Sequence, residues 1–158
     1  MKQTPEYDRI QAQMQKGVIT LDGFLGDDPR KLVDIIAADT MTVHHLKTTC
    51  KLIAAKMEHF RDLGLDGLGE FMTLDEHFEV KVDSIRGLLP SPFGGAGMYH
   101  KVNTTVVNKT LARQVTYTDL HIHLIGDHCF FQGEGSLYRL EPKELVEILE
   151  VDRVPAEE

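Results

Sequence analysis

Four histidines and one cysteine are the side chains of this sequence best suited to hold a metal ion. His121, His123, His128 and Cys129 lie close together in the sequence, and His100 precedes them on a segment rich in Val and Thr. Imidazole and thiolate ligands suit zinc and other divalent transition metals, and a catalytic zinc needs three protein ligands and one open position. One hypothesis is therefore a metal site that activates water or polarises a carbonyl.

The geometry of such a site depends on whether residues 120–128 form a strand or a helix. In a strand, His121 and His123 point the same way and can chelate one ion. In a helix, His121 and His128 share one stripe, while His123 pairs with Asp127 four residues later. We favour the helix because the run Leu-Ile-Gly-Asp-His lacks the alternation of a strand. Neither spacing matches a specific zinc motif.

A simpler interpretation needs no metal. One histidine is buried and hydrogen-bonded, another is solvated, and Cys129 is a small core residue beside Phe130 and Phe131. A nucleophilic Cys129 activated by His128 is disfavoured because residues adjacent in a helix or strand do not face each other. The glycines of residues 94–97 indicate turns rather than a phosphate cradle, since they lead into a strand and not into a helix.

The first half of the chain shows the apolar spacing of amphipathic helices. Thr4 and Pro5 are typical of a helix start, and Gly17 of a stop. The same signals predict the remaining helices, with Gly64 as the stop of the longest one. The four predicted segments are 5–16, 29–38, a short one beginning at 39 or 40 and ending at 45, and one capped by Thr48 and running to 63.

The second half begins with period-two alternation, which predicts half-buried strands. Three strands, near 78–83, 99–107 and 112–118, form an antiparallel meander, and an irregular loop at 87–98 separates the first two. Two helices follow, the last opening at Glu141-Pro142. The predicted fold is α+β: a helical N-terminal half packed on a small three-stranded antiparallel sheet, then two C-terminal helices. We expect one domain over 1–158, frayed at 1–3 and 152–158.

Composition and charge narrow the function classes. Seventeen basic against twenty-five acidic side chains leave a formal charge of −8, which disfavours nucleic acid and anionic membrane surfaces as partners. The sequence contains neither the apolar core of a secretory signal nor a stretch long enough to span a membrane. Cys50 and Cys129 form no short pairing motif, so we expect reduced thiols and a cytoplasmic protein.

Four stretches resemble an uncharacterised family of small bacterial cytosolic proteins. They are FLGDDPRKLVDII, MTVHHLKTTCKLIAAKM, LLPSPFGGAGMYHK and DLHIHLIGDHCFFQGEGSLYRLEP, and the resemblance covers roughly residues 20–150. It implies a bacterial cytosolic protein and assigns no catalytic role to any residue.

Two functional hypotheses follow from these patterns. The leading one is a non-catalytic binding or interaction module that acts as a homodimer, because the apolar loop at 87–98 together with Phe130 and Phe131 offers more hydrophobic surface than a monomer normally exposes. The alternative is a metal-binding protein or metal-dependent enzyme that uses His121, His123 and His128 with Cys129 or His100. No small-molecule ligand and no catalytic residue is assigned by either.

Overall fold

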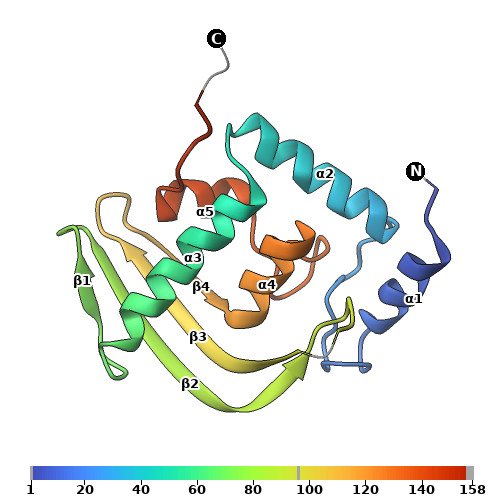
Figure 1. Cartoon of the computed structure of the whole chain (residues 1–158), viewed down its shortest axis with the longest axis horizontal. Coiled ribbons are helices and arrows are strands. Elements are labelled where there is room, and N and C mark those ends of the chain that lie inside the picture. The colour runs from blue at the N-terminus through green and yellow to red at the C-terminus, as the bar shows by residue number, and fades with distance from the viewer. Residues whose placement is uncertain (1, 96, 156–158) are drawn as a thin grey trace.

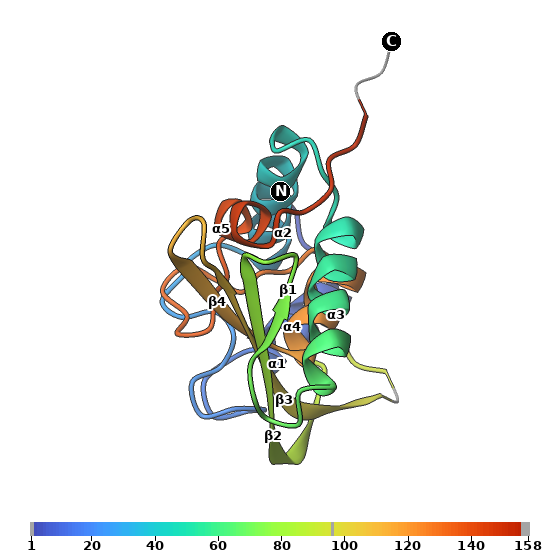
Figure 2. The same cartoon turned by 90° about the vertical axis from the view of Figure 1, so that its left-hand side faces the viewer.

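The computed structural model describes residues 2–95 and 97–155 and shows a four-stranded antiparallel sheet with helices against one face (Figures 1 and 2). The strands lie in chain order: β1 Met72–Leu74, β2 Phe78–Pro90, β3 Met98–Asn108 and β4 Arg113–Thr118. The predicted α+β class is confirmed, and so are the two C-terminal helices. The prediction of three strands is wrong by one, because β1 is too short for an alternating pattern to show in the sequence.

Strand β2 is also longer than predicted, since residues 87–90 belong to it and not to a loop. Its register against β3 shifts between Ile85 and Leu88, and Gly87 adopts a positive φ of 126° there. A glycine inside a bulge is compatible with a strand, so the glycine did not mark its end. The connection between β2 and β3 is thus 91–97, within which Ala96 lies outside the described residues.

The N-terminal half forms three helices, which are α1 Pro5–Gln13, α2 Leu32–His45 and α3 Cys50–Leu65. The two segments predicted over 29–45 are one continuous helix. Asp39, which we expected to cap a new helix, is buried inside α2, and the hydroxyl of Thr40 donates to the Ile36 carbonyl one turn earlier. The cap of α3 is Thr49 and not Thr48, since the Thr49 hydroxyl accepts from the Leu52 amide.

Residues 119–128 are helical, which confirms the preferred alternative. Helix α4 spans Asp119–His128, and α5 spans Pro142–Leu149. Thr118 caps α4 in a reciprocal arrangement: its hydroxyl accepts from the His121 amide, and its own amide donates to His121 Nδ1 at 3.0 Å. A histidine therefore has the role that Glu or Gln usually has in a capping box.

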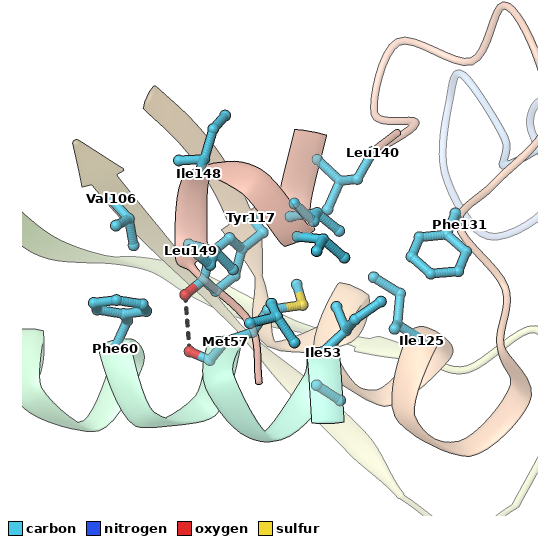
Figure 3. Packing of buried hydrophobic residues seen from close by; sticks show 14 of the residues in the cluster. Ile53, Met57, Phe60, Val106, Tyr117, Ile125, Phe131, Leu140, Ile148 and Leu149 are labelled. Atoms are coloured by element: carbon cyan, nitrogen blue, oxygen red, sulfur yellow. Dashed lines mark hydrogen bonds between the residues drawn. The ribbon is translucent and has the colours of Figure 1, made fainter. Parts of the chain in front are cut away.

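The apolar interior consists of two adjoining clusters. The larger lies between the sheet, α3 and α5, where the Tyr117 hydroxyl donates to the Met57 carbonyl at 2.8 Å (Figure 3). The smaller joins α1, α2 and α4. Phe131 belongs to the first cluster and Phe130 to the second, and both side chains are buried. They are core residues, so the prediction that they offer exposed surface is wrong.

Both ends of the described chain are hydrogen-bonded to the body. The Gln3 side chain accepts from the Val33 amide at 2.9 Å, and the Asp152 carbonyl accepts from the Thr48 hydroxyl at 2.7 Å. The fraying of 1–3 and 152–158 stays a prediction. Within the described ranges, no helix combines the length and apolar character needed to cross a membrane.

Candidate functional site

The structure does not bring the five predicted metal ligands together. Over residues 2–95 and 97–155, no group of three or more His, Cys, Asp or Glu side chains is arranged to hold a metal ion. His100 is exposed on β3, His121 is buried against the loop that follows α4, and Cys129 is bonded to Cys50. The His123 and His128 rings alone come close, with centroids 5.2 Å apart. The metal hypothesis therefore finds no support in this geometry.

His121 has a structural role. Its Nδ1 accepts from Thr118 and its Nε2 lies 2.8 Å from the Tyr138 carbonyl, so the ring carries its proton on Nε2. Burial lowers the pKa of His121 below its ordinary value. The simpler interpretation, a buried and hydrogen-bonded histidine, is correct for this residue.

His123 stands at the centre of a hydrogen-bonded relay. Its Nδ1 lies 2.8 Å from an Asp127 carboxylate oxygen and 2.8 Å from the Tyr99 hydroxyl, and its Nε2 lies 3.0 Å from Ser91 Oγ. The predicted pairing of His123 with Asp127 on a helix is thus confirmed. A serine, a histidine and an aspartate in this order are the groups of a nucleophilic triad. Ser91 and Tyr99 were missed because both are far from α4 in sequence.

The buried position of Ser91 distinguishes this relay from a catalytic one. Ser91 is 6% exposed, and its Oγ also accepts from the Phe93 amide at 3.1 Å. A hydroxyl enclosed in this way orients the imidazole and is poorly placed to attack a substrate. Beside it the His128 ring stacks on Phe93, with centroids 3.7 Å apart, and burial followed by the charge of His123 lowers the pKa of His128.

Cys50 and Cys129 form a disulfide, so the prediction of reduced thiols is wrong. Cys50 is the first residue of α3 and Cys129 caps the C-terminal end of α4, and the two Cα atoms are 5.5 Å apart. The pairing depends on the antiparallel packing of two helices, which the 79-residue separation in sequence does not reveal. Cytoplasmic localisation stays a prediction, and reduced cysteines no longer support it.

A groove of about 390 Å³ runs between α3 and α4. Because the helices are antiparallel, the start of one faces the end of the other. The Lys51–Asp127 ion pair (3.2 Å) lies at the disulfide end, and the Arg61–Asp119 pair (3.4 Å) lies at the opposite end. Small or apolar residues line the groove between these pairs: Ala54, Ala55, Ile122 and Gly126.

The outer edge of β2 is a second feature with functional potential. Strand β1 pairs with β2 only as far as Val80, and in the described part of the chain no strand pairs with that edge from residue 81 onward. Residues 83–88 are all exposed, including Ile85 at 56% and Leu88 at 46%. This surface combines open backbone groups with apolar side chains.

Comparisons of the chain with protein-family models, with curated proteins and with solved structures find no significant match.

Proposed function

We propose that the protein is a non-catalytic binding module that acts as a homodimer, and that two copies associate through the outer edge of β2. The observation that carries this proposal is the unpaired stretch of β2 beyond Val80. An edge strand presents a row of free N–H and C=O groups, which another strand can pair with. A second copy supplies an identical edge, and a two-fold axis lets the two pair antiparallel as a self-complementary interface.

Charge favours this edge over other surfaces for self-association. Two chains with a formal charge of −8 each repel one another. The part of β2 beyond Val80 carries Lys81 and Arg86 against Asp83, so it is one of the less acidic parts of the chain. The opposite edge strand, β4, is shorter and is held to α5 by the Arg113–Glu147 ion pair at 2.7 Å. The β2 edge is therefore where two copies approach with little repulsion.

The relay around His123 supports a non-catalytic role. Its serine is buried and does not line the groove between α3 and α4, so a substrate in that groove does not reach the hydroxyl. Tyr99 and Asp127, which do line the groove, hold His123 Nδ1 in hydrogen bonds. The relay thus fixes the position of α4 against the 91–97 connection.

Light scattering coupled to size-exclusion chromatography tests the proposal over a range of protein concentrations. We expect a mass twice the 17.8 kDa of one chain, and slower amide hydrogen exchange in residues 81–85 at high than at low concentration. Ile85→Lys places a charge on the edge and should give a monomer with an unchanged fold. Leu137→Lys, at a side chain 75% exposed elsewhere, is the matched control and should remain a dimer. A monomeric parent chain at every concentration, or an unaffected Ile85→Lys dimer, contradicts the proposal.

A further inference from the structure

The groove between α3 and α4 has the dimensions and lining of a small-ligand site. Its volume of about 390 Å³ lies within the range of roughly 300–1,000 Å³ that is typical of such sites. The disulfide and the Lys51–Asp127 pair hold one end, while the Arg61–Asp119 pair holds the other. The helices approach closely at Gly126, where an added Cβ would lie 2.9 Å from the Ala54 Cβ. The groove is therefore built into the rigid packing of two helices.

The charges that line the groove are not balanced along its length. At the disulfide end, Lys51 and Asp127 neutralise each other. At the other end, the single guanidinium of Arg61 is shared by Glu58 at 3.7 Å, Asp62 at 3.0 Å and Asp119 at 3.4 Å. Glu58 and Asp119 line the groove and Asp62 lies beside it, so three carboxylates around one cation leave an excess of negative charge at this end of a strongly acidic protein.

Asp119 is the carboxylate of this end whose hydrogen-bonding capacity is not fully used. Its Oδ1 is buried and has no hydrogen-bond partner in the described residues. Burial raises the pKa of Asp119, the charges of Arg61 and His100 oppose that rise, and the charges of Asp62 and Glu58 add to it to a smaller extent. A positive charge placed beside these carboxylates would stabilise their ionised forms.

We propose that this groove binds a small organic cation, specifically a primary amine with a short alkyl body. The ammonium lies at the Glu58 end and donates to the carboxylates, and the alkyl chain lies along Ala54, Ala55 and Ile122. From Glu58 to Lys51 the helix rises about 10 Å, which limits the body to a few methylene groups. A bare metal ion is a poorer match, because apolar side chains line the middle of the groove. The site is separate from the β2 edge, so each proposal can fail alone.

Titration of the full chain with butylammonium chloride, followed by amide NMR shifts, tests the site. We expect saturable shifts confined to residues of α3 and α4 and to Tyr99, which also lines the groove, and none from sodium butyrate at equal ionic strength. Glu58→Gln should weaken binding about tenfold, the value of one charge-assisted hydrogen bond. Glu144→Gln, on the exposed face of α5, is the matched control and should bind as the parent does.

A second variant separates loss of the site from loss of the fold. Ala55→Leu fills the groove from an exposed position of α3, so it should abolish the shifts while the melting temperature stays the same. The proposal is overturned if butylammonium gives no saturable shifts with the folded parent chain. It is equally overturned if butyrate binds as well as butylammonium, or if Glu58→Gln and Ala55→Leu both bind as the parent does.

Discussion

Asp39 and Arg139 form a buried, bidentate ion pair across a sequence separation of 100 residues. Both oxygen–nitrogen contacts measure 2.8 Å, and the two side chains are 7% and 9% exposed. The pair joins α2 to the segment that precedes α5. The hydrogen bonds that Arg139 donates to Asp39, opposed by burial, raise the pKa of Arg139 above its already high ordinary value, so the guanidinium stays charged at every accessible pH.

Breaking this pair from one side should strongly destabilise the fold. We expect Asp39→Ala to lower the free energy of unfolding by about 3 kcal/mol, because it leaves the Arg139 charge buried without its main partner. The double variant Asp39→Leu with Arg139→Met should recover part of that loss, since it removes both charges. Urea unfolding of the three chains measures the difference. A single variant within about 0.5 kcal/mol of the parent would show that the pair is dispensable.

The Cys50–Cys129 disulfide should contribute substantially to stability. The two cysteines are 79 residues apart in sequence, and the loss of chain entropy in the unfolded state that such a cross-link causes corresponds to about 4.5 kcal/mol. We expect a dithiol reductant to lower the urea midpoint of the parent chain. The double variant Cys50→Ala, Cys129→Ala should have a similarly lowered midpoint, and adding reductant should not change that midpoint further. Thiol titration of the non-reduced, denatured chain provides the check: two free thiols would mean that the bond does not form.

Asp28 should make stability depend on pH in the acid range. The Arg30 side chain, 2.7 Å away, lowers the pKa of Asp28 from 3.8 to about 2, with help from the Glu134 amide and against the effect of burial. A carboxylate whose pKa is depressed on folding stabilises the fold above its unfolded pKa, and that contribution disappears as the pH falls from about 4 to about 2. Its size is about 2 kcal/mol.

The Asp28→Asn variant tests this assignment. It should lose about 2 kcal/mol of stability at neutral pH and should show a shallower fall in stability between pH 4 and pH 2 than the parent chain. Asp66→Asn, at an exposed residue after α3, is the comparison variant. If the stability of Asp28→Asn and that of the parent chain fall with the same slope between pH 4 and pH 2, the assignment is contradicted.

The close contact between Gly126 and Ala54 should make the stability of the chain sensitive to which of the two positions carries the methyl group. Gly126→Ala adds a Cβ 2.9 Å from the Ala54 Cβ, and we expect it to destabilise the chain by about 1–3 kcal/mol through overpacking. Adding Ala54→Gly removes the opposing methyl group, so the double variant should be more stable than Gly126→Ala alone. A double-mutant cycle by thermal unfolding measures the coupling, and additive effects would mean that the two positions do not clash.

Local features of the fold were largely predictable from the sequence. Thr4 and Pro5 indicated the start of α1, and the alternation near Phe78 indicated a strand, because each signal lies within a few neighbouring residues. The errors arose where tertiary contacts outweigh local preference. Asp39 looked like a helix cap but is an interior residue that pairs with Arg139, and the glycine at 87 looked like a loop but lies in a bulge.

The candidate site was less predictable because its groups come from three distant segments. His123 and Asp127 lie four residues apart on α4, and their pairing followed from helical spacing. Ser91 and Tyr99 reach the same imidazole from the connection before β3 and from β3 itself. Lys51 and Arg61 reach the groove from α3. No periodic pattern relates these positions to one another.

By itself the sequence determined the α+β class, the acidic charge and the positions of most helices and strands, since these depend on composition and short-range periodicity. Only the tertiary structure decided that Cys50 bonds to Cys129, that Phe130 and Phe131 are buried, and that α3 and α4 enclose a groove. The physical reason is that each of these features requires two segments to meet in space, and the free energy that brings them together comes from burial of the whole core.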